Sequence, residues 1–210
     1  MRLYGGMDKK LTEQTCPAFA ELLASKAAVP GGGGAAALAG ALGIALCNMA
    51  GKLSASPKRA GLYELNEKAE ALKDELIALI DEDAENFEPL SKAYSMPKTT
   101  PGYAETMRLL TLQACKAPMK IMRCCCKAVE LLEQTRALCS KFLLSDIACG
   151  ASLCASALES ASLNVFVNTK MLSDEDAKPI DDEADAMLAQ YLPRARKITD
   201  EIMNTLRGRC

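Results

Sequence analysis

Residues 30–51 read PGGGGAAALAGALGIALCNMAG, and this stretch decides the fold class. It contains no charged residue and a single strongly polar side chain. Alanine and leucine favour helix, so the stretch predicts a central helix that is buried on all sides. Small residues recur four apart, at Ala36 and Gly40 and at Ala39 and Gly43, which lets a neighbouring helix backbone approach closely. The stretch is too short and too rich in glycine to span a membrane, so we expect no membrane association.

The remainder of the chain also reads as helix, because no alternating pattern of polar and apolar residues persists. Pro89 and Pro118 are expected to kink or end the helices that contain them. Beyond the opening stretch, we expect a short helix after Thr15, amphipathic helices over residues 57–94, 103–138 and 174–207, and a second uncharged helix from 147 to about 171. The prediction is an all-α protein with a single domain over residues 1–210. It is a bundle of about six helices with two buried apolar helices, and so much apolar helix also predicts a homodimer.

Composition excludes several classes of function. Lys and Arg number 25 against 27 Asp and Glu, and aromatic residues make up only 4 % with no tryptophan. Without a basic surface or stacking platforms, we expect no nucleic-acid partner. Histidine is absent, which excludes Ser-His-Asp and Cys-His catalysis and histidine-based zinc sites. Acid–base chemistry would therefore fall to Asp, Glu, Lys, Tyr or Cys, with a pKa moved towards neutrality.

The chain holds 10 cysteines, of which Cys124, Cys125 and Cys126 are consecutive. Neighbouring side chains on a helix point about 100° apart, so these three cannot face one ion. No CxxC pair occurs, and we expect core filling with no metal site. Residues 1–6 lack the apolar segment of a signal peptide, which predicts a cytosolic protein with reduced cysteines.

Gly31, Gly32, Gly33 and Gly34, called here the glycine run, open the first apolar helix. Glycines leave the amide N–H groups of a helix N-terminus uncovered, which is a binding place for an anionic or carbonyl group. The alternative is a flexible turn before a tightly packed helix. A nucleotide phosphate site is excluded, because the Gly-Lys-Ser/Thr ending is missing and no strand precedes the run.

Two carboxylates are candidates for proton transfer. Asp146 follows Ser145 at the start of the second apolar helix, where capping worth ~1 kcal/mol is the simpler interpretation. In such apolar surroundings it could instead have a raised pKa and act as acid or base. In the acidic cluster at residues 81–85, Asp83 falls on one stripe with Ile80 and Phe87, so it is the member expected to face inward.

Further polar groups lie on or beside the apolar helices. Asn164 and Asn168, four apart, share one face of the second apolar helix. Asp146 and Asn164 are eighteen residues apart, or about 27 Å along a helix, so one small ligand cannot touch both within one subunit. Lys58 and Arg59 follow the first apolar helix and could hold a carboxylate.

Six segments in order closely resemble the cyclodeaminase/cyclohydrolase family: residues 30–43, 80–87, 93–98, 117–118, 145–146 and 157–168. The family includes the cyclodeaminase domain of formiminotransferase-cyclodeaminase and stand-alone methenyltetrahydrofolate cyclohydrolases. The resemblance implies an all-helical, dimeric, cytosolic enzyme, free of metal, that acts on one-carbon units carried by tetrahydrofolate. It implies no cofactor beyond the tetrahydrofolate substrate.

The resemblance also implies roles for the candidate residues. Asp83 and Asp146 would transfer protons, and Lys58 and Arg59 would face the glutamate tail. Substrate binding would fall to the glycine run, Ser145, Asn164 and Asn168. The absence of a formiminotransferase domain favours a cyclohydrolase, a hydrolase forming formyltetrahydrofolate, over a cyclodeaminase, a lyase releasing ammonia.

Two departures keep a third alternative open, a non-catalytic helical dimer that binds a small anion or a partner protein. Gly34 stands where the family usually has serine. Residues 54–60 read SASPKRA, where the family usually reads Thr-x-Gly-Lys-Lys-Lys-Tyr.

Overall fold

The computed structural model describes residues 10–208, and within this range it contains helices and no strand. The α-helices are α1 (Cys16–Leu23), α2 (Gly32–Ser54), α3 (Gly61–Ala93), α4 (Tyr103–Leu138), α5 (Leu144–Thr169) and α6 (Asp174–Leu206). Three short 3-10 helices are η2 (Leu11–Glu13), η3 (Pro57–Arg59) and η4 (Lys141–Leu143). The predicted all-α bundle of about six helices is therefore confirmed. Residues 1–6, on which the expected cytosolic location depends, lie outside the described range.

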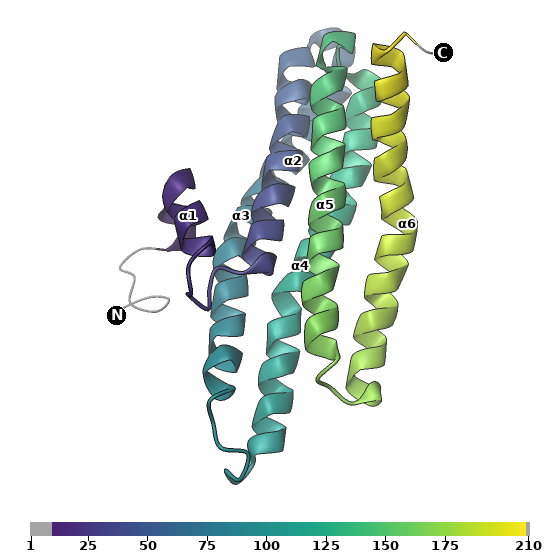
Figure 1. Cartoon of the computed structure of the whole chain (residues 1–210). Coiled ribbons are helices and arrows are strands. Elements are labelled where there is room, and N and C mark those ends of the chain that lie inside the picture. The colour runs from purple at the N-terminus through teal and green to yellow at the C-terminus, as the bar shows by residue number, and fades with distance from the viewer. Residues whose placement is uncertain (1–9, 209–210) are drawn as a thin grey trace.

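Helices α2 to α6 run alternately up and down, and α1 lies at the side of the bundle (Figure 1). α2 packs against α3, α4 and α5, whereas α6 packs against α4 and α5. The closest approach joins α2 and α5: a Cβ added to Gly43 would lie 2.9 Å from the carbonyl oxygen of Gly150. A Cβ on Gly150 would in turn lie 2.7 Å from the oxygen of Gly43. The predicted close approach of a helix to the small residues is confirmed.

The two prolines do not end the expected helices, but one helix boundary needs a correction. Of the two outcomes expected at these prolines, a kink or a helix end, the second does not occur, since Pro89 and Pro118 both lie inside their helices. A proline removes one backbone hydrogen bond, but long amphipathic helices gain most of their stability from the face that they bury. The helix expected over residues 57–94 is instead interrupted near its start, where η3 ends and α3 begins at Gly61.

The expectation that both apolar helices are buried on all sides is wrong for the single chain. Leu42 and Leu53 of α2 are 53 % and 68 % exposed, and Leu163 and Val167 of α5 are 67 % and 60 % exposed. These helices lie side by side, and Figure 1 shows no helix in front of them. The expectation that the first apolar helix is too short to span a membrane is wrong for α2 in length. Both α2 and the stretch Lys141–Thr169 are long and apolar enough to cross a membrane by length and composition alone, a test that core helices of soluble proteins also pass.

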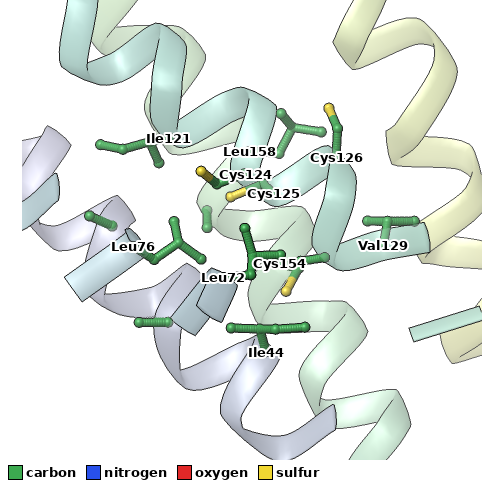
Figure 2. Packing of buried hydrophobic residues seen from close by; sticks show 14 of the residues in the cluster. Ile44, Leu72, Leu76, Ile121, Cys124, Cys125, Cys126, Val129, Cys154 and Leu158 are labelled. Carbon is green, nitrogen blue, oxygen red and sulfur yellow. The ribbon is translucent and has the colours of Figure 1, made fainter. Parts of the chain in front are cut away.

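The consecutive cysteines fill the core, as predicted. Cys124, Cys125 and Cys126 are all buried, and Figure 2 shows Cys126 pointing away from the other two. Burial raises the pKa of Cys124 and of Cys126 to about 12, which keeps both thiols protonated. Among residues 10–208, no group of three His, Cys, Asp or Glu side chains is placed to hold a metal ion.

A buried carboxylate that the sequence analysis did not single out anchors the N-terminal segment. Asp81 of α3 accepts a hydrogen bond from the backbone N–H of Leu11 at 2.8 Å and from the hydroxyl of Thr12 at 2.6 Å. Leu11 is itself buried in the core. The acidic cluster at residues 81–85 therefore sends two carboxylates inward, and Asp81 has a structural partner.

Candidate active site

The glycine run forms the N-terminus of α2. Gly31 is the N-cap and has no side chain to cap the helix, and the backbone N–H of Ala35 donates to the oxygen of Gly31. The first amides of a helix have no partner within the helix. The N–H of Gly34 donates to the carboxylate of Asp83, which belongs to α3. The amides of Gly32 and Gly33 thus stand at the positive end of the helix dipole, before its first intrahelical bond.

Asp83 reaches this helix end because Gly33 has no Cβ. A Cβ added there would lie 2.5 Å from the carboxyl carbon of Asp83, closer than real atoms approach. Asp83 is only 9 % exposed, and burial raises the pKa of its carboxyl to about 6, although the Gly34 N–H partly opposes that rise. The inward orientation predicted for Asp83 is confirmed. Its pKa lies in the range that suits a general base near neutral pH.

Asn164 brings α5 to the same point. Its side-chain Nδ2 donates to the carbonyl of Ser160 at 2.8 Å, which orients the amide. Its Oδ1 lies 2.9 Å from where a Cβ of Gly32 would be, so it faces the glycine run. Gly32, Gly33, Asp83 and Asn164 therefore meet at the start of α2, and we call these four residues the glycine site. Asn168 is buried one helical turn further along α5.

The other candidates lie at the opposite end of the bundle. Ser145 and Asp146 are in the first turn of α5, and because α5 is one continuous helix, the predicted separation of about 27 Å from Asn164 holds. Lys58 and Arg59 are exposed in η3, just past the C-terminus of α2. Arg59 donates to the carbonyl of Ser54 at 3.5 Å, a contact with the last residue of that helix. Within one chain, none of these four residues reaches the glycine site.

The glycine site combines three chemical functions. Two amide N–H groups can donate to an oxygen that gains negative charge, as in other sites built on helix N-termini. Asp83 can take a proton at neutral pH, and Asn164 offers an acceptor beside Gly32. The arrangement is suited to adding water to an electrophilic carbon.

A family model described as formiminotransferase-cyclodeaminase matches residues 15–186. The chain belongs to this family. It is 31 % identical over 205 residues to a methenyltetrahydrofolate cyclohydrolase of Methylorubrum extorquens, and the match covers 93 % of this chain and 97 % of the relative. It is 29 % identical to the formimidoyltransferase-cyclodeaminase of Gallus gallus over 206 residues, 92 % of this chain but only 37 % of that longer protein.

The fold is similar to that of a solved member. A formiminotetrahydrofolate cyclodeaminase from Thermotoga maritima matches with a TM-score of 0.80 at 23 % identity, covering 92 % of this chain and all of that chain. The departure at Gly34 is also compatible with the family's fold. A Cβ there would meet Pro30 at 3.5 Å and Ile80 at 3.8 Å, which is ordinary contact, so the serine usual in the family would fit.

Proposed function

We propose that this chain is a folate one-carbon enzyme that hydrolyses methenyltetrahydrofolate to formyltetrahydrofolate. The observation that carries the proposal is the buried Asp83, whose pKa of about 6 makes it a base at neutral pH, in contact with the start of α2, where the first amides have no partner within the helix. The near full-length likeness to a methenyltetrahydrofolate cyclohydrolase supports the choice of substrate.

In the proposed reaction, water adds to the electrophilic methenyl carbon, and Asp83 takes a proton from that water as the C–O bond forms. The N–H groups of Gly32 and Gly33 stabilise the oxygen of the adduct. The bond between the carbon and one folate nitrogen then breaks. The hydroxyl proton leaves as the formyl C=O forms and the freed nitrogen takes up a proton, so that one proton is released overall.

Release of ammonia from formiminotetrahydrofolate is the second candidate. The animal relatives are formimidoyltransferase-cyclodeaminases, which favours it. That reaction needs one group to accept a proton and another to donate one to the leaving ammonia. Asp83 is the carboxylate in contact with the glycine run, whereas Asp146 lies at the other end of the chain. The single carboxylate that one chain places at its own glycine site suits the hydrolysis better.

Incubation with each substrate tests this choice. We expect the purified protein to remove the methenyl absorbance well above the spontaneous rate and to release ammonia from formiminotetrahydrofolate slowly. The Asp83→Asn variant, assayed in parallel, corrects for spontaneous hydrolysis. Faster ammonia release would replace the cyclohydrolase by the cyclodeaminase. Failure to bind either folate near millimolar concentration would favour the non-catalytic dimer.

We also propose that the chain works as a homodimer through the uncharged face of α2 and α5. A 23-residue helix is about 34 Å long and two helices are about 20 Å wide, so the face offers roughly 700 Å². That is close to the ~800 Å² which each partner buries in a standard interface. A face on which exposed apolar side chains such as Leu42, Leu163 and Val167 gather is typical of a protein–protein contact.

Charge placed on this face should separate the copies. We expect wild type to sediment as a dimer and the double variant Leu163→Glu, Val167→Glu as a monomer, because each glutamate would lose its water in the interface. Leu109→Glu is the matched control, since Leu109 is 53 % exposed on α4, away from this face. A monomeric wild type, or a double variant that stays dimeric, would refute the dimer through this face.

The dimer would also decide the role of Asp146. If two copies pair with their helices antiparallel, Asp146 of one copy comes close to the glycine site of the other. Asp83→Asn and Asp146→Asn should then each be inactive, whereas a refolded equal mixture should regain about a quarter of wild-type activity. Half of the randomly formed dimers would be mixed, and each would hold one intact site of two. A fully active Asp146→Asn variant would remove Asp146 from the mechanism.

A further inference from the structure

Helices α3 and α5 both continue past the point where α2 begins. Figure 1 shows that α2 starts part-way up the bundle, while α3, α4 and α5 extend below it. Asp83 of α3 and Asn164 of α5 lie level with the start of α2. Beyond these residues, α3 continues to Ala93 and α5 continues to Thr169. The substrate of the glycine site would therefore lie beside these extensions.

Each extension presents one stripe of side chains on the side of the glycine site. On α3, Phe87, Leu90 and Tyr94 follow Asp83 at spacings of four, seven and eleven residues, which keeps them on its face. On α5, Asn168 follows Asn164 at a spacing of four, and Met171 lies in the turn directly after the helix, where its N–H donates to the carbonyl of Asn168. Polar groups thus gather at the start of α2, and larger apolar groups follow.

The two stripes meet again at their far ends. The hydroxyl of Tyr94 donates to the sulfur of Met171 at 3.6 Å. Along α3, Asp83 is about 15 Å from Ala93, the last residue before Tyr94, and along α5, Asn164 is about 8 Å from Thr169, two residues before Met171. The glycine site therefore lies at one end of the space between the extensions of α3 and α5, and the Tyr94–Met171 contact lies at the other end.

Tyr94 has the properties of a binding residue. Its hydroxyl is held by Met171, yet the side chain is 47 % exposed, so part of the ring remains free for contact. Helical side chains lean towards the N-terminus, which brings this ring back towards Asp83. Aromatic residues are only 4 % of the chain, yet two of them, Phe87 and Tyr94, fall on this stripe.

We propose that Tyr94 is a substrate-binding residue whose ring stacks on the flat aromatic part of the folate, with the one-carbon centre at Asp83. This inference rests on the proposed function, because the glycine site by itself could bind only a polar group and does not indicate a ligand with rings. Folate carries ring systems beside its one-carbon centre, and ring stacking is the interaction that Tyr94 adds. Met171 positions the ring.

Substitutions at Tyr94 test this inference with methenyltetrahydrofolate as the probe. We expect Tyr94→Ala to raise KM by about 5- to 150-fold, the loss in binding found when an aromatic side chain stacked on a nucleobase is replaced by alanine, with little change in kcat. Tyr94→Phe keeps the ring and should stay within about threefold of wild type. Tyr63→Ala is the matched control, because Tyr63 is 52 % exposed on the same helix, about 46 Å from Tyr94.

The outcomes separate this inference from the function itself. An unchanged KM in Tyr94→Ala, with an active wild type, would overturn the binding role and leave the cyclohydrolase intact. An equal rise in KM in Tyr63→Ala would also overturn it, since a distant ring would matter as much. A wild type that neither binds nor turns over the folate would overturn both proposals.

Discussion

Replacing Asp83 by asparagine is expected to abolish turnover and, above pH 7, to make the protein more stable. Loss of a general base typically lowers kcat by 10²–10⁴-fold. The gain in stability follows from burial, because the pKa of this carboxyl is about 6 in the folded protein against an ordinary value of 3.8. Asparagine has nearly the same shape, and its Oδ1 can still accept the N–H of Gly34.

The effect on stability should depend on pH. Below pH 3.8 the carboxyl is protonated in both the folded and the unfolded chain, so its ionisation does not affect the free energy of unfolding. Between about pH 4 and 6 the unfolded chain ionises more readily, and the folded protein loses stability. Above pH 6 the loss is complete, at about 3 kcal/mol, and asparagine removes it. We therefore expect the Tm of Asp83→Asn to exceed that of wild type at pH 8 by several degrees and to converge with it near pH 4.

Asp81→Asn is the matched control, two residues away in the same helix and also buried. Its carboxylate accepts bonds from Leu11 and Thr12 with separate oxygens, and an amide can accept only one of them. We expect it to lose about 1–3 kcal/mol of stability and to keep its turnover. An active Asp83→Asn variant that is less stable than wild type at pH 8 would make Asp83 a structural cap of α2.

The pH profile of the wild type should show the same group. We expect kcat/KM to rise with pH and level off above about pH 7, because the base form of Asp83 appears through a pKa of about 6.

Substitution of Gly33 by alanine is expected to lower kcat/KM by at least 100-fold. The new Cβ would overlap the carboxyl group of Asp83, so Asp83 must turn away or the start of α2 must shift. Displacements of about 1 Å at a reacting centre cost on the order of 10²-fold in rate. Overpacking at this point should also cost 1–3 kcal/mol of stability, measured by denaturant unfolding.

Substitutions at the other three glycines of the run are controls for Gly33→Ala, because a new Cβ would meet its neighbours at different distances at each position. Gly31→Ala adds a Cβ with nothing within 4 Å and should leave the free energy of unfolding nearly unchanged. Gly32→Ala meets the movable end of the Asn164 side chain at 2.9 Å and should have an intermediate effect. Gly34→Ser should be tolerated, because its Cβ makes only ordinary contacts. If Gly33→Ala were as active as wild type, the close approach of Asp83 to the helix end would not matter for catalysis.

Much of the fold could be predicted from local pattern. Helical periodicity, the absence of charge in residues 35–51 and the recurrence of small residues are properties of short segments, and they led correctly to an all-α bundle. The stripe of Ile80, Asp83 and Phe87 likewise predicted the inward carboxylate. Local pattern did not reveal Asp81, because its partners Leu11 and Thr12 lie about seventy residues away in the sequence.

The sequence predicted the residues of the candidate site one by one, and only some of these residues lie together in the structure. Gly33, Asp83 and Asn164 were each singled out, and they meet. Asp146 and Arg59 were singled out with equal reason, and they lie at the other end of the bundle. Tyr94 lies within one of the segments that resemble the family, and its spacing of eleven residues from Asp83 is the sequence signal that places it on the same helix face.

The sequence by itself determined that this protein is helical, that a glycine run opens an uncharged helix and that the chain belongs to the formiminotransferase-cyclodeaminase family. Only the tertiary structure decided which residues of α3 and α5 stand level with the start of α2. Which residues lie level with each other depends on the axial offset between neighbouring antiparallel helices. That offset is set by packing contacts such as that of Gly43 with Gly150, which are more than a hundred residues apart in the sequence. The tertiary structure also decided that one face of α2 and α5 stays exposed, because no helix among residues 10–208 covers it.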